Sequence, residues 1–584
     1  MNKNILILII TVVLSIGCEK DFLERVPQTD LSQAGFFKTV KDLETYTNGF
    51  YDYLGASDRD LSTDDQTRYS EGDALNTKLK GFLNPESSGG WNWGELRNIN
   101  YFLENYDRVE GEESDINHFV GIARYSRARF YINKIQRFGK APWYDQTLGT
   151  NDEELLYKGH DSREFVVGKI MEDLEFASQH VKADQPKARI SKWAVLSEIS
   201  RFALYEGTFR KYHTDLGLND ANTFFTKSSE ASEEIMGSGK FSLYNTGKPM
   251  EDYNNLFKSE DLSSNPEVIL QLDFDKTLGR THGVVVYFYW GLSKNLADSY
   301  LMEDGSRFTD IPDYDKKGFV EVFENRDPRM AQTFMAPGYV FPNEENPYLV
   351  VATYGGYTQQ KFLHDDKDNS QWEAPTDMAM YRYAEILLNH AEAKAELGSL
   401  TQADINATIN AIRTRVEMPG MNMASANNNP DPIQEAQYPN VSGPNKGVIL
   451  EIRRERRVEL ACEGFRETDM YRWKNGITLA QPQVGMYVPG FGGVDVTGDG
   501  IEDIAILNSP SETGPIDTLP NKDALIKYYI SDGAFYLTEG DKGFIAMSGD
   551  IVQPKSFPEP KYYYSPVPQS ATVVNPNLTQ PPGW

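Results

Sequence analysis

The spacing of apolar residues predicts a series of helices in the first half of the chain. Apolar and aromatic side chains recur at intervals of three and four over residues 116–138, and the pattern stops at Gly139. A second such stretch begins at Ser162, a candidate N-cap, and a third begins at Ser191. Because a short turn containing Pro186 joins the second stretch to the third, we expect these two helices to form an αα-hairpin.

Another helical pair is predicted downstream. Helical spacing runs over residues 383–395 and stops at Gly398, and Thr401 begins a partner helix. Alanines on the inner face of the first helix allow close approach, as in tetratricopeptide-type hairpins, although no strict repeat of about 34 residues is present. The sequence therefore predicts a mainly α fold with tetratricopeptide-like helix pairs forming a scaffold.

Residues 448–474 combine regularly spaced glutamates with arginines. Five glutamates recur at intervals of four from Glu451 to Glu467, and five arginines in the same span cancel their charge. We interpret this stretch as a salt-bridged helix rather than a nucleic-acid-binding arm. Cys462 within it is expected to be a small buried apolar residue, and His390 in the preceding Ala-rich helix a packed structural residue.

Long stretches rich in Gly, Pro, Asn, Asp and Tyr connect the predicted helices. Connections of this length in a compact protein are usually functional surfaces, so we expect a large loop-rich ligand-binding face. Residues 268–274 and 284–290 have the β-branched and aromatic content of strands. Either could form a small sheet, so we expect little β structure. The loop-rich stretches are 55–95, 240–380, 418–446 and 476–584.

The N-terminus has the pattern of a lipoprotein signal peptide. Lys3 is followed by an apolar run over residues 5–16, and Gly17 then precedes Cys18. The run is too short to span a bilayer, for which a helix needs about 20 residues. Residues 1–17 are therefore predicted to be removed and Cys18 to be lipidated. Ser15 departs from the common lipobox, and a plain secretory signal or an uncleaved anchor remains as an alternative.

The charge balance disfavours nucleic acid and anionic lipid surfaces as partners. Acidic residues outnumber basic ones 86 to 58, so the averaged field repels nucleic acid and anionic lipid surfaces. The HExxH, GxSxG and P-loop motifs and spaced CxxC pairs do not occur, which removes the common zinc, serine-hydrolase and nucleotide signatures. Two carboxylates of a glycoside hydrolase could still be present among the acidic residues.

One acidic segment resembles a calcium-binding loop. Asp495, Asp499 and Asp503 occupy the first, fifth and ninth positions of an EF-hand-type loop. The twelfth position is Ile506 rather than a bidentate carboxylate, so an acidic, solvated turn is the alternative to calcium binding.

Two tryptophans are the strongest ligand-binding candidates. Trp91 and Trp93 lie in a Gly-flanked loop just before a predicted helix. Exposed indole rings offer flat apolar faces on which the C–H surface of a sugar stacks. The alternative is that both pack into the core, and we expect one to be exposed and the other buried.

Five ordered landmarks together resemble the SusD-like (RagB/SusD) family of nutrient-binding outer-membrane lipoproteins. They are CEKDFLERVPQTDLSQAGFF, WNWGELRNINYFLEN, RYAEILLNHAEAKAELG with INAIRTRVEMPG, IRRERRVELACEGFRETDMYRWK, and the ending NPNLTQPPGW. The resemblance implies that residues 18–584 form a single domain in which four helix pairs support the ligand-binding loops. It also implies surface exposure through the Cys18 lipid, and capture of a glycan for delivery to a SusC-like TonB-dependent transporter.

The resemblance also places the site. The tryptophan landmark contains Trp91, Trp93 and Asn98, and further loop residues are expected on the same side: Arg68, Asp73, Tyr289, Trp290 and Trp372. Calcium occurs in some relatives. Binding of peptides or other non-glycan nutrients, and surface glycoside hydrolysis, are the alternative functions.

Overall fold

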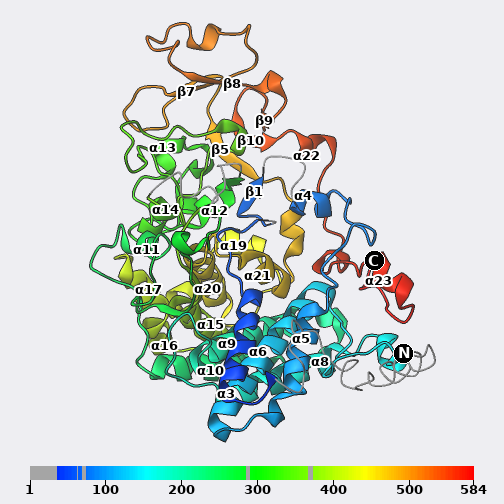
Figure 1. Ribbon diagram of the computed structural model, residues 1–584. Helices are drawn as coiled ribbons and strands as arrows, with labels where there is room; N and C mark the ends of the chain where they lie inside the picture. The colour runs from blue at the N-terminus through cyan, green and yellow to red at the C-terminus, as the bar shows by residue number, and fades with distance from the viewer. Residues whose placement is uncertain (1–35, 62, 69–73, 284–289, 366–372) are drawn as a thin grey trace, which may run out of the picture.

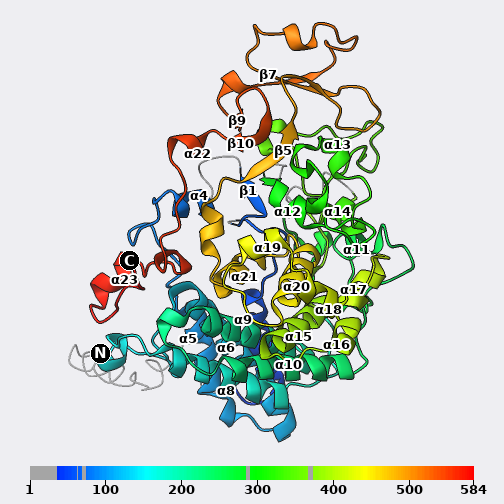
Figure 2. The same ribbon diagram turned by 180° about the vertical axis from the view of Figure 1, so that it is seen from behind.

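A computed structural model describes the chain over residues 36–61, 63–68, 74–283, 290–365 and 373–584. Packed helices fill one half of the molecule, and loops with short helices and small sheets fill the other (Figures 1 and 2). In these ranges no helix is both long enough and apolar enough to cross a bilayer. The predicted signal peptide, residues 1–17, and Cys18 lie outside them.

The helical half begins with helices that pack in chain order. They are α3 (Val40–Thr47), α5 (Gly94–Leu103), α6 (Glu113–Phe138), α8 (Arg163–His180), α9 (Lys192–Tyr212) and α10 (Ala221–Gly237). Both α3 and α5 contact α6, and α6 contacts α8. The αα-hairpin of α8 and α9 is confirmed, and its predicted N-cap forms, because the Phe165 amide donates to Ser162 Oγ at 3.2 Å.

The second group of helices continues this scaffold. It consists of α15 (Tyr383–Leu397), α16 (Gln402–Ala407), α17 (Ile409–Arg415), α20 (Lys446–Glu459) and α21 (Arg466–Arg472). Helix α15 packs against α9, α10, α17 and α20, and it ends at Gly398, where φ is +76°. The predicted partner helix after Thr401 is broken at Thr408 into α16 and α17. The mainly α fold is confirmed.

The prediction of one helix over 448–474 is wrong. Helix α20 ends at Glu459 and α21 begins at Arg466, with Cys462 between them at φ +66°. The carboxylate of Asp60, from a distant loop, accepts hydrogen bonds from the backbone amides of Cys462 (2.5 Å) and Arg466 (3.2 Å). These bonds satisfy amide groups that the break leaves without helical partners. Cys462 is buried, as predicted.

Short elements occupy the predicted loop-rich stretches. The helices are α4 (Ala74–Leu79), α7 (Glu153–Leu156), α11 (Asp252–Asn255), α12 (Lys294–Ser299), α13 (Phe319–Val322), α14 (Pro328–Thr333), α18 (Met423–Asn428), α19 (Pro432–Gln437), α22 (Gly549–Val552) and α23 (Gln569–Val574). The strands are β1 (Gln66–Arg68), β2 (Val268–Leu272), β3 (Trp290–Leu292), β4 (Met378–Arg382), β5 (Val484–Val488), β6 (Gly492–Val494), β7 (Ile504–Leu507), β8 (Ile526–Tyr529), β9 (Phe535–Leu537) and β10 (Gly543–Met547).

The strands form small separate sheets. They pair as β1–β3, β2–β4, β5–β10–β9 and β6–β7–β8, and every pairing is antiparallel except β7–β8. The strand predicted over 268–274 is confirmed as β2. Of the strand predicted over 284–290, only Trp290 lies within the described residues, and it begins β3.

The largest hydrophobic core brings the end of the chain to the first helices. Buried residues of α5, α6, α8 and α9 pack together with Tyr562, Tyr563 and Tyr564. The C-terminal segment therefore lies beside the helices that follow the tryptophan loop (Figure 1).

Candidate functional site

Trp91 and Trp93 pack against each other in the loop that precedes α5. Their ring centroids are 5.3 Å apart and the ring planes meet at 82°, an edge-to-face arrangement. Trp91 also contacts the Phe138 ring (4.8 Å), and Trp93 contacts the Tyr144 ring (5.3 Å). Both tryptophans are half-buried, so the expectation of one exposed and one buried ring is wrong. Each indole shields part of the other.

Lys134 on α6 holds this loop from inside. Its Nζ donates to the carbonyl oxygens of Gly90 (2.6 Å) and Asn92 (2.9 Å). The same ammonium lies 5.2 Å from the Trp93 ring centroid, within cation–π range. Burial lowers the pKa of Lys134 to about 8, so the group is still mainly protonated at pH 7.

A cavity of about 650 Å³ opens beside the two indole rings. The rings form one side, and the C-terminal helix α23 with the residues that follow it contributes the other. The lining is mainly apolar with a few amide and guanidinium groups, and the volume falls in the usual range for small-molecule sites. The lining residues are Trp91, Asn92, Trp93, Gly94, Leu96, Arg97, Asn100, Pro142, Tyr144, Gln146, Leu148, Leu156, Ser570, Ala571, Val574, Asn575 and Leu578.

Hydrogen bonds fix the walls of this cavity before any ligand arrives. Asn100 Nδ2 donates to the carbonyl oxygens of Tyr144 (3.0 Å) and Gln146 (3.1 Å). On the C-terminal side, Asn575 Nδ2 donates to the Lys158 carbonyl oxygen (2.9 Å). A wall held in this way loses little conformational entropy on binding.

Asn98 does not join the two tryptophans at the cavity. It is exposed on α5, and its Nδ2 donates to the hydroxyl of Tyr53 at 3.0 Å. Arg97 and Asn100 on the same helix line the cavity, and a helix turns by about 100° per residue, which directs position 98 elsewhere.

The other predicted binding residues lie wholly or partly outside the described part of the chain. Asp73, Tyr289 and Trp372 are outside it, and Arg68 and Trp290 are described by their backbone alone. These two residues are register partners in the β1–β3 pair. Two loop segments more than 200 positions apart therefore do meet. That their side chains share a face with Trp91 stays a prediction.

The acidic segment after β6 is a hydrogen-bonded turn. The carboxylates of Asp495, Asp499 and Asp503 accept hydrogen bonds of 2.7–3.1 Å from backbone amides of the same segment. Within the described ranges no group of three or more acidic, His or Cys side chains is arranged to hold a metal ion. These contacts fit the solvated-turn alternative, and calcium binding here stays a prediction.

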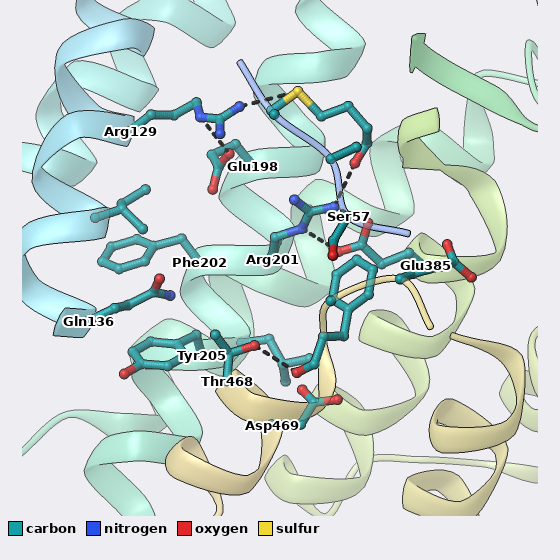
Figure 3. Close-up of a pocket in the computed structure, with 18 of the residues that line it drawn as sticks. Ser57, Arg129, Gln136, Glu198, Arg201, Phe202, Tyr205, Glu385, Thr468 and Asp469 are labelled. Carbon is teal, nitrogen blue, oxygen red and sulfur yellow. Dashed lines mark hydrogen bonds and ion pairs between the residues drawn. The ribbon is translucent and has the colours of Figure 1, made fainter. Parts of the chain in front are cut away.

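Another cavity, of about 270 Å³, is lined by charged side chains from α6, α9, α15 and α21 (Figure 3). Arg201 donates from Nε and Nη2 to both carboxylate oxygens of Glu385, at 2.6 and 2.7 Å. Asp469 accepts from Arg456 (2.7 Å) and from Arg472 (2.8 Å). The cavity is therefore neutralised largely by its own side chains and does not require a charged ligand.

Sequence reasoning missed this cavity and the C-terminal wall of the tryptophan site. The arginines and glutamates of 448–474 were expected to pair within one helix, but several reach distant acids. Arg457, for example, donates to Asp65 (2.7 Å from Nε to Oδ1). No local pattern marks residues 570–578 as neighbours of Trp91. Their position follows from the packing of Tyr562–Tyr564 on the first helices.

Comparisons with known proteins agree with this architecture. A model of the SusD family matches residues 266–584. The SusD-like protein P38 of Formosa agariphila is 24% identical over 526 residues, covering 83% of this chain and 94% of that protein. The SusD-like protein P2 of the same organism is 22% identical over 516 residues, covering 82% and 93%.

Solved structures share the fold. A SusD-like protein from Bacteroides fragilis has a TM-score of 0.68 at 19% identity, covering 96% of this chain and 100% of that one. A SusD-like carbohydrate binding protein from the same organism also reaches 0.68, at 20% identity, covering 93% and 100%. Since the family model covers more than half of the sequence, this chain belongs to the SusD family.

Proposed function

We propose that this protein is a non-catalytic, cell-surface lipoprotein that captures an oligosaccharide in the cavity beside Trp91 and Trp93. The observation that carries the proposal is this mainly apolar cavity of about 650 Å³, lined by two half-buried indole rings. Sugar C–H faces stack on indole, while amides such as those of Asn92 and Gln146 can bond the hydroxyls. A similar fold occurs in a protein described as SusD-like and carbohydrate binding.

Anchoring and delivery extend this proposal. Family membership supports attachment to the outer membrane through lipidated Cys18, and transfer of the glycan to a SusC-like TonB-dependent transporter. Transfer requires release, and the expected affinity is modest. Each sugar hydroxyl exchanges hydrogen bonds with water for hydrogen bonds with protein at little net gain, so stacking area and preorganisation determine affinity.

Binding without hydrolysis is supported by the contacts of two carboxylates in the charged cavity. A glycoside hydrolase needs a carboxylic acid that stays protonated to donate to the leaving group. In Glu385 and Asp469 both carboxylate oxygens instead accept hydrogen bonds from guanidinium groups at 2.6–2.8 Å, so none is left to face a leaving group. Purified protein incubated with polysaccharide should therefore release no reducing ends.

Titration calorimetry with a panel of oligosaccharides, and with peptides as the competing ligand class, tests the proposal. Saccharide binding that weakens in Trp93→Ala supports it. Binding of peptides alone, or cleavage of any saccharide, would refute it.

A further inference from the structure

Besides the tryptophan cavity and the charged cavity of Figure 3, a further cavity of about 470 Å³ borders the tryptophan loop at Gly90. It is called the second cavity below, because it is the second one beside this loop. Lys134 and Phe138 of α6 line it, and both contact the tryptophan pair: the Lys134 ammonium lies 5.2 Å from the Trp93 ring centroid, and the Phe138 ring 4.8 Å from that of Trp91. Lys134 and Phe138 therefore lie between the second cavity and the indole rings that line the first.

The charged groups lining this second cavity are mainly cationic. Lys78 from α4, Lys134 and Arg137 from α6 contribute three positive charges, against one carboxylate, Glu467 of α21. Over the described ranges, no carboxylate lies within 4.0 Å of any of these three cations. In the charged cavity of Figure 3, by contrast, arginines and carboxylates pair. The excess of positive charge in the second cavity is also opposite in sign to the formal charge of the whole chain, which is −28.

The contacts of the three cations leave donor groups available. Lys78 Nζ donates to the Tyr471 hydroxyl (2.6 Å), which in turn donates to Glu467 Oε1 (3.1 Å), so a neutral phenol separates this lysine from the carboxylate. Lys134 already uses two N–H groups on the loop carbonyls and mainly positions the loop.

Arg137 is exposed, and among the described residues its guanidinium forms no hydrogen bond with a protein acceptor. The guanidinium carbon lies against Gly90, where a Cβ would approach it to 2.6 Å, and 5.4 Å from the Phe138 ring centroid. The side chain is therefore held in place by packing while its planar set of N–H donors stays open to a ligand.

Electrostatics in the cavity agree with this geometry. Burial and the charge of Arg137 together lower the pKa of Lys78 and of Lys134 to about 8, against the opposing effect of Glu467 on Lys78 and of Glu95 on Lys134. Cations held together at such a cost are stabilised by a bound anion.

We infer that the second cavity receives a carboxylate or sulfate group of the captured saccharide, so that the ligand of this protein is an acidic glycan. Lys78 and Arg137 would donate charge-assisted hydrogen bonds to that group while a neighbouring sugar ring stacks on the tryptophan pair. The inference rests on the proposed function, since it assigns the chemical class of the same ligand.

Calorimetric titration of acidic oligosaccharides against their neutral counterparts tests the inference. Oligouronates are compared with the carboxyl-reduced chains, and sulfated oligosaccharides with the desulfated chains, which separates the two anion sources. The variants are Lys78→Met and Arg137→Gln, with Arg108→Gln as the matched control, because Arg108 is an exposed arginine that lines neither cavity. Circular dichroism establishes that each variant keeps its helical signal.

The expected result is a preference of about tenfold or more for an acidic chain over its neutral counterpart. Each of the two variants should weaken binding of the acidic chain by roughly ten- to one-hundredfold and leave the neutral chain nearly unchanged. Arg108→Gln should leave the affinity for both the acidic and the neutral chain unchanged.

Three results would overturn the inference. Equal affinities for acidic and neutral chains would refute the anion site, and so would a preference for the acidic chain that survives both Lys78→Met and Arg137→Gln. In either case the proposed glycan binding stands if Trp93→Ala weakens binding of both chains. If no saccharide binds and Trp93→Ala has no effect, the proposed function fails and this inference fails with it.

Discussion

The ammonium of Lys134 lies 5.2 Å from the centre of the Trp93 ring while it donates to the backbone on both sides of Trp91. One buried side chain thus fixes the loop that carries the pair of indole rings and also lies between the two cavities. The position of the tryptophans therefore depends on α6, the longest helix of the scaffold, rather than on the loop alone.

Lys134→Met should disorder the tryptophan loop without unfolding the scaffold. The carbonyl oxygens of Gly90 and Asn92 lose their donor, which costs about 1–3 kcal/mol of unfolding free energy. We expect glycan affinity to fall by about tenfold, because the ligand must now order the loop. Urea unfolding and calorimetry measure the two effects. Lys169→Met on α8, which removes an exposed ion pair, should change stability by less than about 1 kcal/mol; equal effects of both substitutions would contradict this role for Lys134.

Trp93→Ala should weaken glycan binding by at least about tenfold, because it removes a large stacking face. The helical circular-dichroism signal should persist, since Trp93 is half-buried at the edge of the core. Trp193→Phe is the matched control, because Trp193 is a half-buried tryptophan of α9 that contacts Phe241 rather than the cavity. Loss of the helical signal in Trp93→Ala would show instead that this ring is a core residue.

Binding of an acidic glycan should depend on pH. Lys78, which faces Tyr471, Glu467 and Arg137, has a pKa lowered to about 8, as has Lys134, which faces Glu95 and Arg137. The attraction for an anion is therefore strongest below about pH 7 and weakens as the pH rises through 8 and the lysines become neutral, which leaves the Arg137 guanidinium as the remaining cation. Calorimetry from pH 6 to about 9.5 should show weakening for the acidic chain alone. A parallel fall for its neutral counterpart would contradict the assignment.

Stability of the scaffold should depend on the buried carboxylate of Glu392. It accepts from Arg472 Nη1 and Nη2 at 2.5 and 2.7 Å and from Trp473 Nε1 at 2.7 Å. Glu392→Gln removes one of the two carboxylates that pair with the buried Arg472 guanidinium, leaving only Asp469, and should lower the unfolding free energy by about 3–5 kcal/mol at pH 7. Urea unfolding measures this. Glu234→Gln, at an exposed ion pair with Lys192, should cost less than about 1 kcal/mol.

The same carboxylate predicts the direction of the acid response. The guanidinium groups lower the pKa of Glu392 to about 2 against the opposing effect of burial. Its contribution to stability is therefore complete above about pH 4.5, its unfolded value, and is lost as the pH falls toward 2. Wild-type protein should lose more stability across this range than Glu392→Gln does. Identical acid profiles would contradict the prediction.

Local patterns predicted the parts of this fold that local interactions determine. The helices α6, α8, α9 and α15 follow from apolar spacing, and the Ser162 cap and the stop at Gly398 follow from residue type. The break between α20 and α21 could not be predicted in this way. The backbone amides at the break donate to the carboxylate of Asp60, which lies about 400 residues earlier in the chain.

The same distinction applies to the candidate site. Trp91 and Trp93 could be selected because adjacent indoles beside glycines form a local signal. The opposite wall at α23 and the cationic cavity could not, because Lys78, Arg137 and Glu467 come from three separate helices. Asn98 was selected with the tryptophans from its place in the same landmark, and the turn of α5 directs it away from them.

The central claim is that a saccharide stacks on Trp91 or Trp93. The most direct measurement is a crystal structure of the protein soaked with the oligosaccharide that binds most tightly in the panel. The account predicts a sugar ring within about 4 Å of one of the two indole rings. A sugar bound elsewhere, with the cavity between the tryptophans and α23 empty, would contradict it.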